Sequence, residues 1–161
     1  MSTPPIAWHW KRFGELEPAE LYALLGARAE VFIVEQACAF QDLDGLDAFA
    51  WHLLGWSERN GDRSLAAYLR LIEPGRKYAE PSIGRVLTTT AFRGLGLGRA
   101  AMVEGLAHAN ALYPGHAIRI GAQQRLERFY EELGFRTVSA PYQEDNIAHV
   151  EMLRSVDRVH P

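Results

Sequence analysis

The chain has little cysteine and no long apolar run, and each absence excludes a class of protein. Its 161 residues include one cysteine, Cys38, so no disulfide can form within the chain, which is consistent with a reducing compartment. No stretch approaches the roughly 20 apolar residues that span a bilayer. The N-terminus lacks the cationic and apolar regions of a secretory signal. We therefore expect a cytoplasmic protein without a membrane partner, in which Cys38 is a buried thiol with no covalent role.

An excess of positive charge is also absent. The chain has 17 Lys and Arg against 20 Asp and Glu, a net charge of −3, so it lacks the basic surface that nucleic acid requires. No His, Cys and Asp cluster has the spacing of metal ligands, and we predict no metal. With 48% hydrophobic and 23% charged residues, the composition is globular, and the length suits a single domain over 1–161.

Periodic apolar patterns predict an α/β fold. Pro18 should open a first helix, Asn60-Gly61 should close a hairpin, and Gly134 should end the last helix. This order of elements implies a mixed sheet with helices on both faces, in which residues 83–122 form a parallel crossover. Strands are expected at 6–12, 49–57, 64–72, 83–89, 117–122, 135–138 and 147–153, and the later helices at 98–112 and 125–133.

A glycine-rich loop follows the strand expected at 83–89. It reads Arg93-Gly94-Leu95-Gly96-Leu97-Gly98-Arg99. Glycine lets backbone N–H groups approach a ligand, and the helix that follows adds unpaired N–H groups and the positive end of its dipole. The loop therefore predicts a pyrophosphate site, to which Arg93 and Arg99 add positive charge. A plain structural turn is the alternative for the loop alone.

The same loop allows a dinucleotide interpretation. Gly96-x-Gly98-x-x-Ala101 matches the Gly-x-Gly-x-x-Gly/Ala fingerprint. That fingerprint expects an acidic residue about 20 positions further on, where this chain has Ile120-Gly121-Ala122-Gln123. An NAD-type enzyme is therefore disfavoured, and a P-loop is excluded because Gly-Lys-Ser/Thr is missing.

Two segments together resemble the GNAT superfamily of acyl-CoA N-acetyltransferases. One is the loop 93–98, and the other is Gln123-x-x-Leu126-x-x-Phe129-Tyr130-x-x-x-Gly134-Phe135. Further segments, spread over nearly the whole chain, are similar to the ElaA-like branch. They are Arg28-x-x-Val31-Phe32-x-Val34-Glu35-Gln36, Asp44-x-x-Asp47, Gly84-Arg85-Val86, Ala122-Gln123 and Glu144-Asp145-x-Ile147-x-His149-x-x-Met152.

The chain departs from these patterns in three places. Asn146 and Ala148 stand where the branch often has Gly and Pro, so we expect a looser turn at 144–149. Thr88-Thr89-Thr90 replaces the common Val-x-Pro, and Gln123 replaces the Asn of most superfamily members, although Gln is usual in the branch.

The resemblance implies a GNAT-like fold and an acetyl-CoA (CoA) site. The sheet should be mostly antiparallel, with about seven strands, a central parallel pair that splays apart and helices on both faces. Backbone at 94–99 would hold the pyrophosphate, with Gln123 and Tyr130 also near the cofactor. Backbone at Leu87 and Thr88 would pair with the pantetheine amide, and a free N–H there would polarise the thioester carbonyl.

The implied reaction is direct attack of a primary amine, from a small molecule or peptide, on the thioester in a ternary complex. A non-catalytic acyl-CoA-binding domain is the alternative function. Tyr130 resembles the family's thiolate donor, whereas its helical pattern alone indicates a core tyrosine. The oligomeric state is open, a homodimer included. Candidates for the general base are Glu35, His52, Glu144, Asp145 and His149, with a water relay as the alternative.

The candidate side chains have distinct expected roles. Apolar surroundings could raise the pKa of Glu35, which with His149 is our main candidate base. His52, Glu144 and Asp145 are expected to contact the substrate amine. Arg28 lies on an apolar helical stripe and needs a partner. That partner is either an acid among Asp42, Asp44 and Asp47 or a substrate carboxylate.

Overall fold

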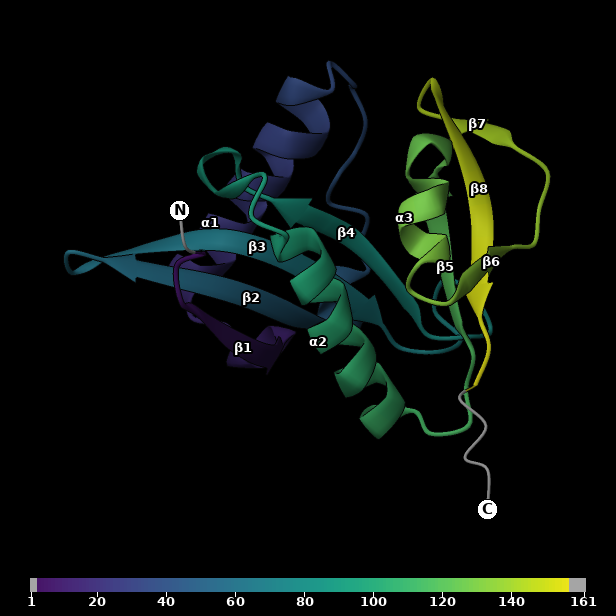
Figure 1. Ribbon diagram of the computed structural model, residues 1–161, viewed down its shortest axis with the longest axis horizontal. Coiled ribbons are helices and arrows are strands. Elements are labelled where there is room, and N and C mark those ends of the chain that lie inside the picture. The colour runs from purple at the N-terminus through teal and green to yellow at the C-terminus, as the bar shows by residue number, and fades with distance from the viewer. Residues whose placement is uncertain (1–2, 157–161) are drawn as a thin grey trace.

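The computed structural model describes residues 3–156, and within them the strands form one eight-stranded sheet (Figure 1). The sheet order is β1-β2-β3-β4-β5-β8-β6, and β7 pairs with β8. The strands are β1 (Ile6–Arg12), β2 (Ala50–Arg59), β3 (Asp62–Ile72), β4 (Ser82–Thr88), β5 (Ile118–Gln123), β6 (Phe135–Thr137), β7 (Tyr142–Glu144) and β8 (Ile147–Arg154), and the α-helices are α1 (Pro18–Arg28), α2 (Leu97–Leu112) and α3 (Glu127–Glu131).

The sheet consists of two antiparallel halves that meet at one point. Strands β4 and β5 run parallel and share a single register pair, Ser82 with Arg119. Beside it, the Arg119 N–H donates to the Pro81 carbonyl at 3.1 Å. From there the two strands diverge, as Figure 1 shows. The mixed α/β fold with a central splayed parallel pair is thus confirmed, with eight strands in place of about seven.

Helices cover both faces of the first half of the sheet, because neighbouring apolar residues of β2 and β3 point to opposite sides. Leu53 and Leu69 pack in the core that contains α2, whereas Leu54 and Tyr68 pack in the core that contains α1. The packing of α2 on β3 is close, since a Cβ added at Gly105 would lie 2.9 Å from a Leu69 methyl carbon. The predicted helices on both faces are therefore present (Figure 1).

The first helix does not remain α-helical. After Arg28 the chain continues as a π-helical segment, Ala29–Glu35, which is rich in β-branched residues that lose side-chain freedom in a helix. The helix expected at 125–133 is also shorter: a 3₁₀ turn, Gln124–Leu126, precedes α3. Gly134, with φ +93°, follows this helix as predicted.

Two hairpins close with paired residues of positive φ. Asn60 and Gly61 join β2 to β3, as the sequence predicts, with φ of +55° and +82°. Asp145 and Asn146 join β7 to β8 in the same way, with φ of +49° and +63°. The expectation of a loose turn at 144–149 is wrong, because Asp and Asn tolerate the left-handed region that a two-residue turn requires. Within residues 3–156, no helix has the length and apolar character to span a bilayer.

Candidate active site

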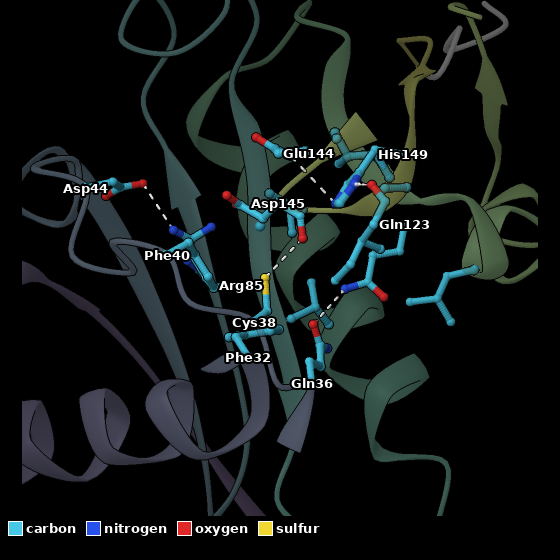
Figure 2. A pocket seen from close by; sticks show the side chains of 18 of the residues that line it. Phe32, Gln36, Cys38, Phe40, Asp44, Arg85, Gln123, Glu144, Asp145 and His149 are labelled. Carbon is cyan, nitrogen blue, oxygen red and sulfur yellow. Dashed lines mark hydrogen bonds and ion pairs between the residues drawn. The ribbon is translucent and has the colours of Figure 1, made fainter. Parts of the chain in front are cut away.

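A cavity of about 490 Å³ lies where β4 and β5 diverge. Its walls come from Gly84–Val86 of β4, Ile120–Gln123 of β5, Phe32–Gln41 and the β7–β8 hairpin. Figure 2 shows the side chains of these segments around the cavity. Elements far apart in the sequence therefore meet at the position where the topology leaves a gap in the sheet.

A β-bulge shapes the β4 wall. Arg70 pairs with Gly84 and Tyr68 with Leu87, so one residue of β3 faces two of β4. The extra residue is accommodated at Arg85, which has φ +52°. Since the one register pair with β5 is at Ser82, the backbone edge near Leu87 and Thr88 faces the gap. The edge that the predicted pantetheine contact requires is thus available.

The glycine loop presents open backbone at the start of α2. Gly94 and Gly96 have φ of +78° and +76°, and a Cβ added at either would meet no atom within 4 Å. No side chain caps the helix, and its first backbone hydrogen bond runs from Ala100 N–H to Gly96 O at 3.1 Å. Among the described residues, the N–H groups at 97–99 have no backbone acceptor. The loop therefore fits an anion such as a pyrophosphate.

The side chain of Arg93 is directed away from this role. Its guanidinium donates twice to the Glu35 carboxylate, the second bond measuring 2.7 Å, and its Nε donates to Thr88 O at 3.3 Å. These contacts lower the pKa of Glu35. The expected raised pKa of Glu35 is therefore wrong. Glu35 also does not line the cavity. Arg99, half-exposed, lies 3.4 Å from Glu132.

Tyr130 lies in the cavity wall and is 8% exposed. Its ring makes edge contacts with Phe129 and Phe135, at centroid distances of 5.0 and 6.0 Å. Burial raises the pKa of Tyr130 to about 12, and no group within residues 3–156 hydrogen-bonds its hydroxyl. The residue is thus a core tyrosine that also forms part of the cavity wall.

His149 lies across the cavity from the bulge and pairs with Gln123 in the sheet register. Its Nδ1 donates to Ile147 O at 2.7 Å, which in a neutral ring leaves Nε2 as a proton acceptor. Nε2 lies 3.6 Å from a Glu144 carboxylate oxygen. Of the candidate bases, His149 therefore lines the cavity and has a ring nitrogen that bonds no other group among the described residues.

Three side-chain contacts connect the segment after α1 to other parts of the chain, and Figure 2 shows the two that lie in the cavity wall. Gln123 Nε2 donates to Gln36 Oε1 at 3.2 Å, and Cys38 Sγ donates to the carbonyl of Asp145 at 3.2 Å. The third is the pair of Glu35 with Arg93. Cys38 is buried, and Asp145 lines the cavity with Glu144.

Comparison with known proteins identifies the family. The sequence model of the "Acetyltransferase (GNAT) domain" matches residues 60–156. A UPF0039 protein of Synechocystis is 43% identical over 92% of this chain and 94% of its own length, and protein ElaA of Escherichia coli is 37% identical over 94% and 97%. The chain belongs to the GNAT acetyltransferase family.

Solved structures agree with this assignment. A crystal structure of an acyl-CoA N-acyltransferase from Pseudomonas aeruginosa matches at a TM-score of 0.87 and 41% identity, covering 94% of this chain and all (100%) of that one. Escherichia coli ElaA matches at 0.85 and 37%, with the same coverage. The GNAT and ElaA-like resemblance is thus confirmed, and the fold gives the NAD-type alternative no support, since the sheet within residues 3–156 has one parallel pair.

Two predicted substrate contacts of the GNAT chain are instead structural. Arg28 is 0% exposed and its nitrogens bond Asp42 and Asp47, so it has the acid partners that the sequence offered as one alternative. His52 is also 0% exposed, bonded to Tyr68 Oη at 2.7 Å and Asp47 O at 2.9 Å, and burial lowers its pKa. Neither side chain lines the cavity, so the structure gives both residues contacts within the fold and none at the candidate site.

Arg28 belongs to a closed ring of three arginines and three aspartates, which we call the Arg/Asp ring. Each arginine bridges two aspartates and each aspartate bridges two arginines. The pairs are Arg28–Asp42 at 3.0 Å, Asp42–Arg85 at 2.8 Å, Arg85–Asp44 at 3.4 Å, Asp44–Arg70 at 2.5 Å, Arg70–Asp47 at 3.0 Å and Asp47–Arg28 at 2.6 Å. Sequence reasoning found the acids but missed Arg70 and Arg85. The ring fixes the segment 42–47 against the bulge, and its members Arg85 and Asp44 line the cavity.

Proposed function

We propose that this protein transfers the acetyl group of acetyl-CoA to a primary amine of a small molecule or peptide, by direct attack in a ternary complex. The observation that carries the proposal is the cavity between β4 and β5, which Tyr130 and His149 both line. The uncapped start of α2 lies beside it, since a Cβ added at Gly98 would lie 3.7 Å from Thr88 Oγ1 at the end of β4.

The chain's own groups fit acetyl-CoA at two places. The open N–H groups at 97–99 would hold the pyrophosphate, because anions bind uncapped helix starts. The backbone edge of β4 at Leu87 and Thr88 would bind the pantetheine arm, and an N–H there would polarise the thioester carbonyl. When bound, acetyl-CoA supplies the activated acetyl group. Neither contact requires a particular side chain, so Thr88-Thr89-Thr90 is compatible with it.

Two side chains would carry the protons. His149 Nε2 accepts the proton that the amine loses as its nitrogen forms the new C–N bond, directly or through a water, and Glu144 stabilises the resulting imidazolium. Tyr130 then donates its hydroxyl proton to the sulfur as the C–S bond breaks. A phenol whose pKa is raised to about 12 retains its proton at neutral pH, which suits a donor.

Two measurements test this function. In a thermal-shift assay, acetyl-CoA and CoA should raise the melting temperature, whereas NAD should not. Free thiol release should then appear when the acetyl-CoA complex meets a panel of primary amines. Stabilisation by acetyl-CoA without turnover of any amine would favour the non-catalytic acyl-CoA-binding alternative, and the absence of stabilisation would refute the cofactor assignment.

A further inference from the structure

Two cationic groups on the wall of the cavity are not used by the proposed acetyl transfer. Lys77 lines the cavity, and no carboxylate within residues 3–156 lies at ion-pair distance from its ammonium group. Its one recorded contact is with the ring of Tyr78, at 5.5 Å. Partial burial lowers the pKa of Lys77. Among the neighbouring charges, Glu144 and Asp44 raise it, and Arg70 and Arg85 lower it.

Arg85 offers the second cationic group. Its Nε and Nη2 bond Asp42 and Asp44 within the Arg/Asp ring, whereas Nη1 has no partner among the described residues. Nη1 is not one of the buried polar atoms that lack a hydrogen-bond partner, and the Arg85 side chain is 20% exposed. The free nitrogen is therefore accessible to a ligand. The Arg/Asp ring contains as many aspartates as arginines, so its charges balance. The positive charge of Lys77 is therefore not neutralised by the ring.

Negative charge also lines the same cavity. Figure 2 shows Arg85 and Asp44 on one side, and Glu144 and His149 on the opposite side. Glu144 and Asp145 have no arginine or lysine within ion-pair distance in the part of the chain described, and the nearest cationic partner of Glu144 is His149 at 3.6 Å. The cavity wall therefore carries groups of both signs that have no ion-pair partner of the Arg/Lys–Asp/Glu kind: the carboxylates of Glu144 and Asp145, and the ammonium of Lys77.

Apolar side chains form a third part of the cavity wall. Phe32 and Phe40 line the cavity, and the Arg85 guanidinium lies 5.5 Å from the Phe40 ring centroid. An acceptor with one charge of each sign and an apolar body would complement all three parts of the wall.

We propose that the acceptor is a zwitterionic amino acid. Its amine lies toward Glu144 and His149, and its carboxylate binds Lys77 and the unpaired Nη1 of Arg85. This inference rests on the proposed acetyl transfer and adds the substrate class. A simple amine would leave Lys77 without a counter-charge in the complex, whereas a carboxylate beside it pairs both cationic donors.

The test uses matched acceptors and matched variants of the whole chain. Each amino acid is assayed beside the amine that lacks its carboxylate and beside its amide: phenylalanine with phenethylamine and phenylalaninamide, leucine with isopentylamine and leucinamide. Lys77→Gln should lower kcat/KM for the amino acids about tenfold, mainly through KM, because a charged hydrogen bond is lost. It should change kcat/KM for the amines and amides less than about twofold. Lys77→Arg should restore the kcat/KM for the amino acids.

Arg76→Gln is the control, since it removes the same charge one residue away. Arg76 pairs with Glu73 at 2.8 Å and lies over the Phe49 ring, and it does not line the cavity. Arg76→Gln should leave kcat/KM unchanged for the amino acids, the amines and the amides. If amines are acetylated but Lys77→Gln affects all acceptors equally, or if the decarboxylated amines are preferred and Lys77→Gln improves them, the zwitterion proposal is refuted while the acetyl transfer stands. If no amine reacts with a protein that binds acetyl-CoA, the proposed function fails, and this inference fails with it.

Discussion

Glu35 and Arg93 form a bidentate ion pair that joins the π-helical segment to the first residue of the glycine loop. The pair stands 58 residues apart in the sequence. Together with the contacts of Gln36 and Cys38, it connects the 35–38 segment to three separate elements around the cavity. Since its pKa is lowered, we propose that Glu35 positions the 35–38 segment and does not accept the amine proton.

Replacing Glu35 tests this distinction. Glu35→Gln should weaken acetyl-CoA binding a few fold, because Arg93 and the loop lose a tether, and should leave kcat within about twofold. Calorimetry and steady-state kinetics measure the two effects. A loss of kcat near that typical for a removed general base, about 100-fold, would restore Glu35 as the base and contradict our interpretation.

Removing the hydroxyl of Tyr130 should affect catalysis more than binding. Tyr130→Phe retains the edge contacts with Phe129 and Phe135, so the fold and the acetyl-CoA affinity should be unchanged. We expect kcat to fall about 100-fold, the effect typical of a lost proton donor. Unchanged kcat with an unchanged melting temperature would leave Tyr130 as a packing residue only.

His149 should be the other group that limits turnover. His149→Gln retains a polar side chain beside Ile147 and Glu144, but an amide cannot accept a proton from the amine. We expect kcat to fall about 100-fold. Added imidazole should restore part of the rate, which a purely structural defect would not show. Full activity in His149→Gln would assign the proton to a water relay.

A Cβ on the glycine loop should block the approach of the cofactor to the loop backbone. Gly96→Ala adds one methyl group at φ +76°, in space that is open in this structure. Gly61→Ala is the matched control, since Gly61 has φ +82° and open surroundings but lies at a hairpin tip. Both should cost stability of about 1 kcal/mol. The loss of acetyl-CoA affinity should occur in Gly96→Ala alone, and equal affinities would locate the pyrophosphate elsewhere.

The Arg/Asp ring should make stability depend on acid pH. Burial opposes ionisation of Asp47, but Arg28 and Arg70 outweigh it, so its pKa is lowered in the folded state. Since the unfolded value is about 3.9, the contribution of Asp47 is complete above about pH 4. It is lost as the pH falls through the lower folded value.

Asp47→Asn should therefore lower the free energy of unfolding at pH 7 by about 3 kcal/mol, because Arg28 is left buried with one fewer anion. It should also flatten the fall in stability below about pH 4. Asp62→Asn, at the exposed start of β3, is the control and should change neither. Urea denaturation from pH 3 to 7 measures both effects, and a flat acid profile in the wild type would contradict the assignment.

The sequence alone predicted the strands and turns that carry their own signals. β1 was predicted at its observed bounds, Ile6–Arg12, and the Asn60-Gly61 turn follows from its residue types. β7 was missed because its three residues, Tyr142–Glu144, have no periodicity of their own and form a strand only by pairing with β8. Such short elements depend on tertiary contacts that a local pattern does not contain.

The sequence predicted the site best where a motif specifies the backbone conformation. It predicted the site worst where ion pairs determine the role of a side chain. Tyr130 and His149 line one cavity, whereas Glu35 was assigned a raised pKa because its partner Arg93 could not be known from spacing. The bulge at Arg85 contradicts local propensity, which disfavours φ +52° for arginine, and the ring holds it there. One signal was present: Arg70 is a charge within the apolar run 65–72, and such a residue requires a buried partner.

The gap between β4 and β5 also bears on aggregation. An unpaired strand edge at the margin of a sheet can recruit other chains. The open edge of β4 lies inside the sheet instead, since β4 pairs with β5 at Ser82 and β5 lies across the gap from the rest of that edge. The 35–38 segment and the β7–β8 hairpin also line the cavity at this edge, so they occupy space that a second polypeptide strand would need. The fold can therefore keep backbone hydrogen-bonding groups open for a ligand without offering them as a template for self-association.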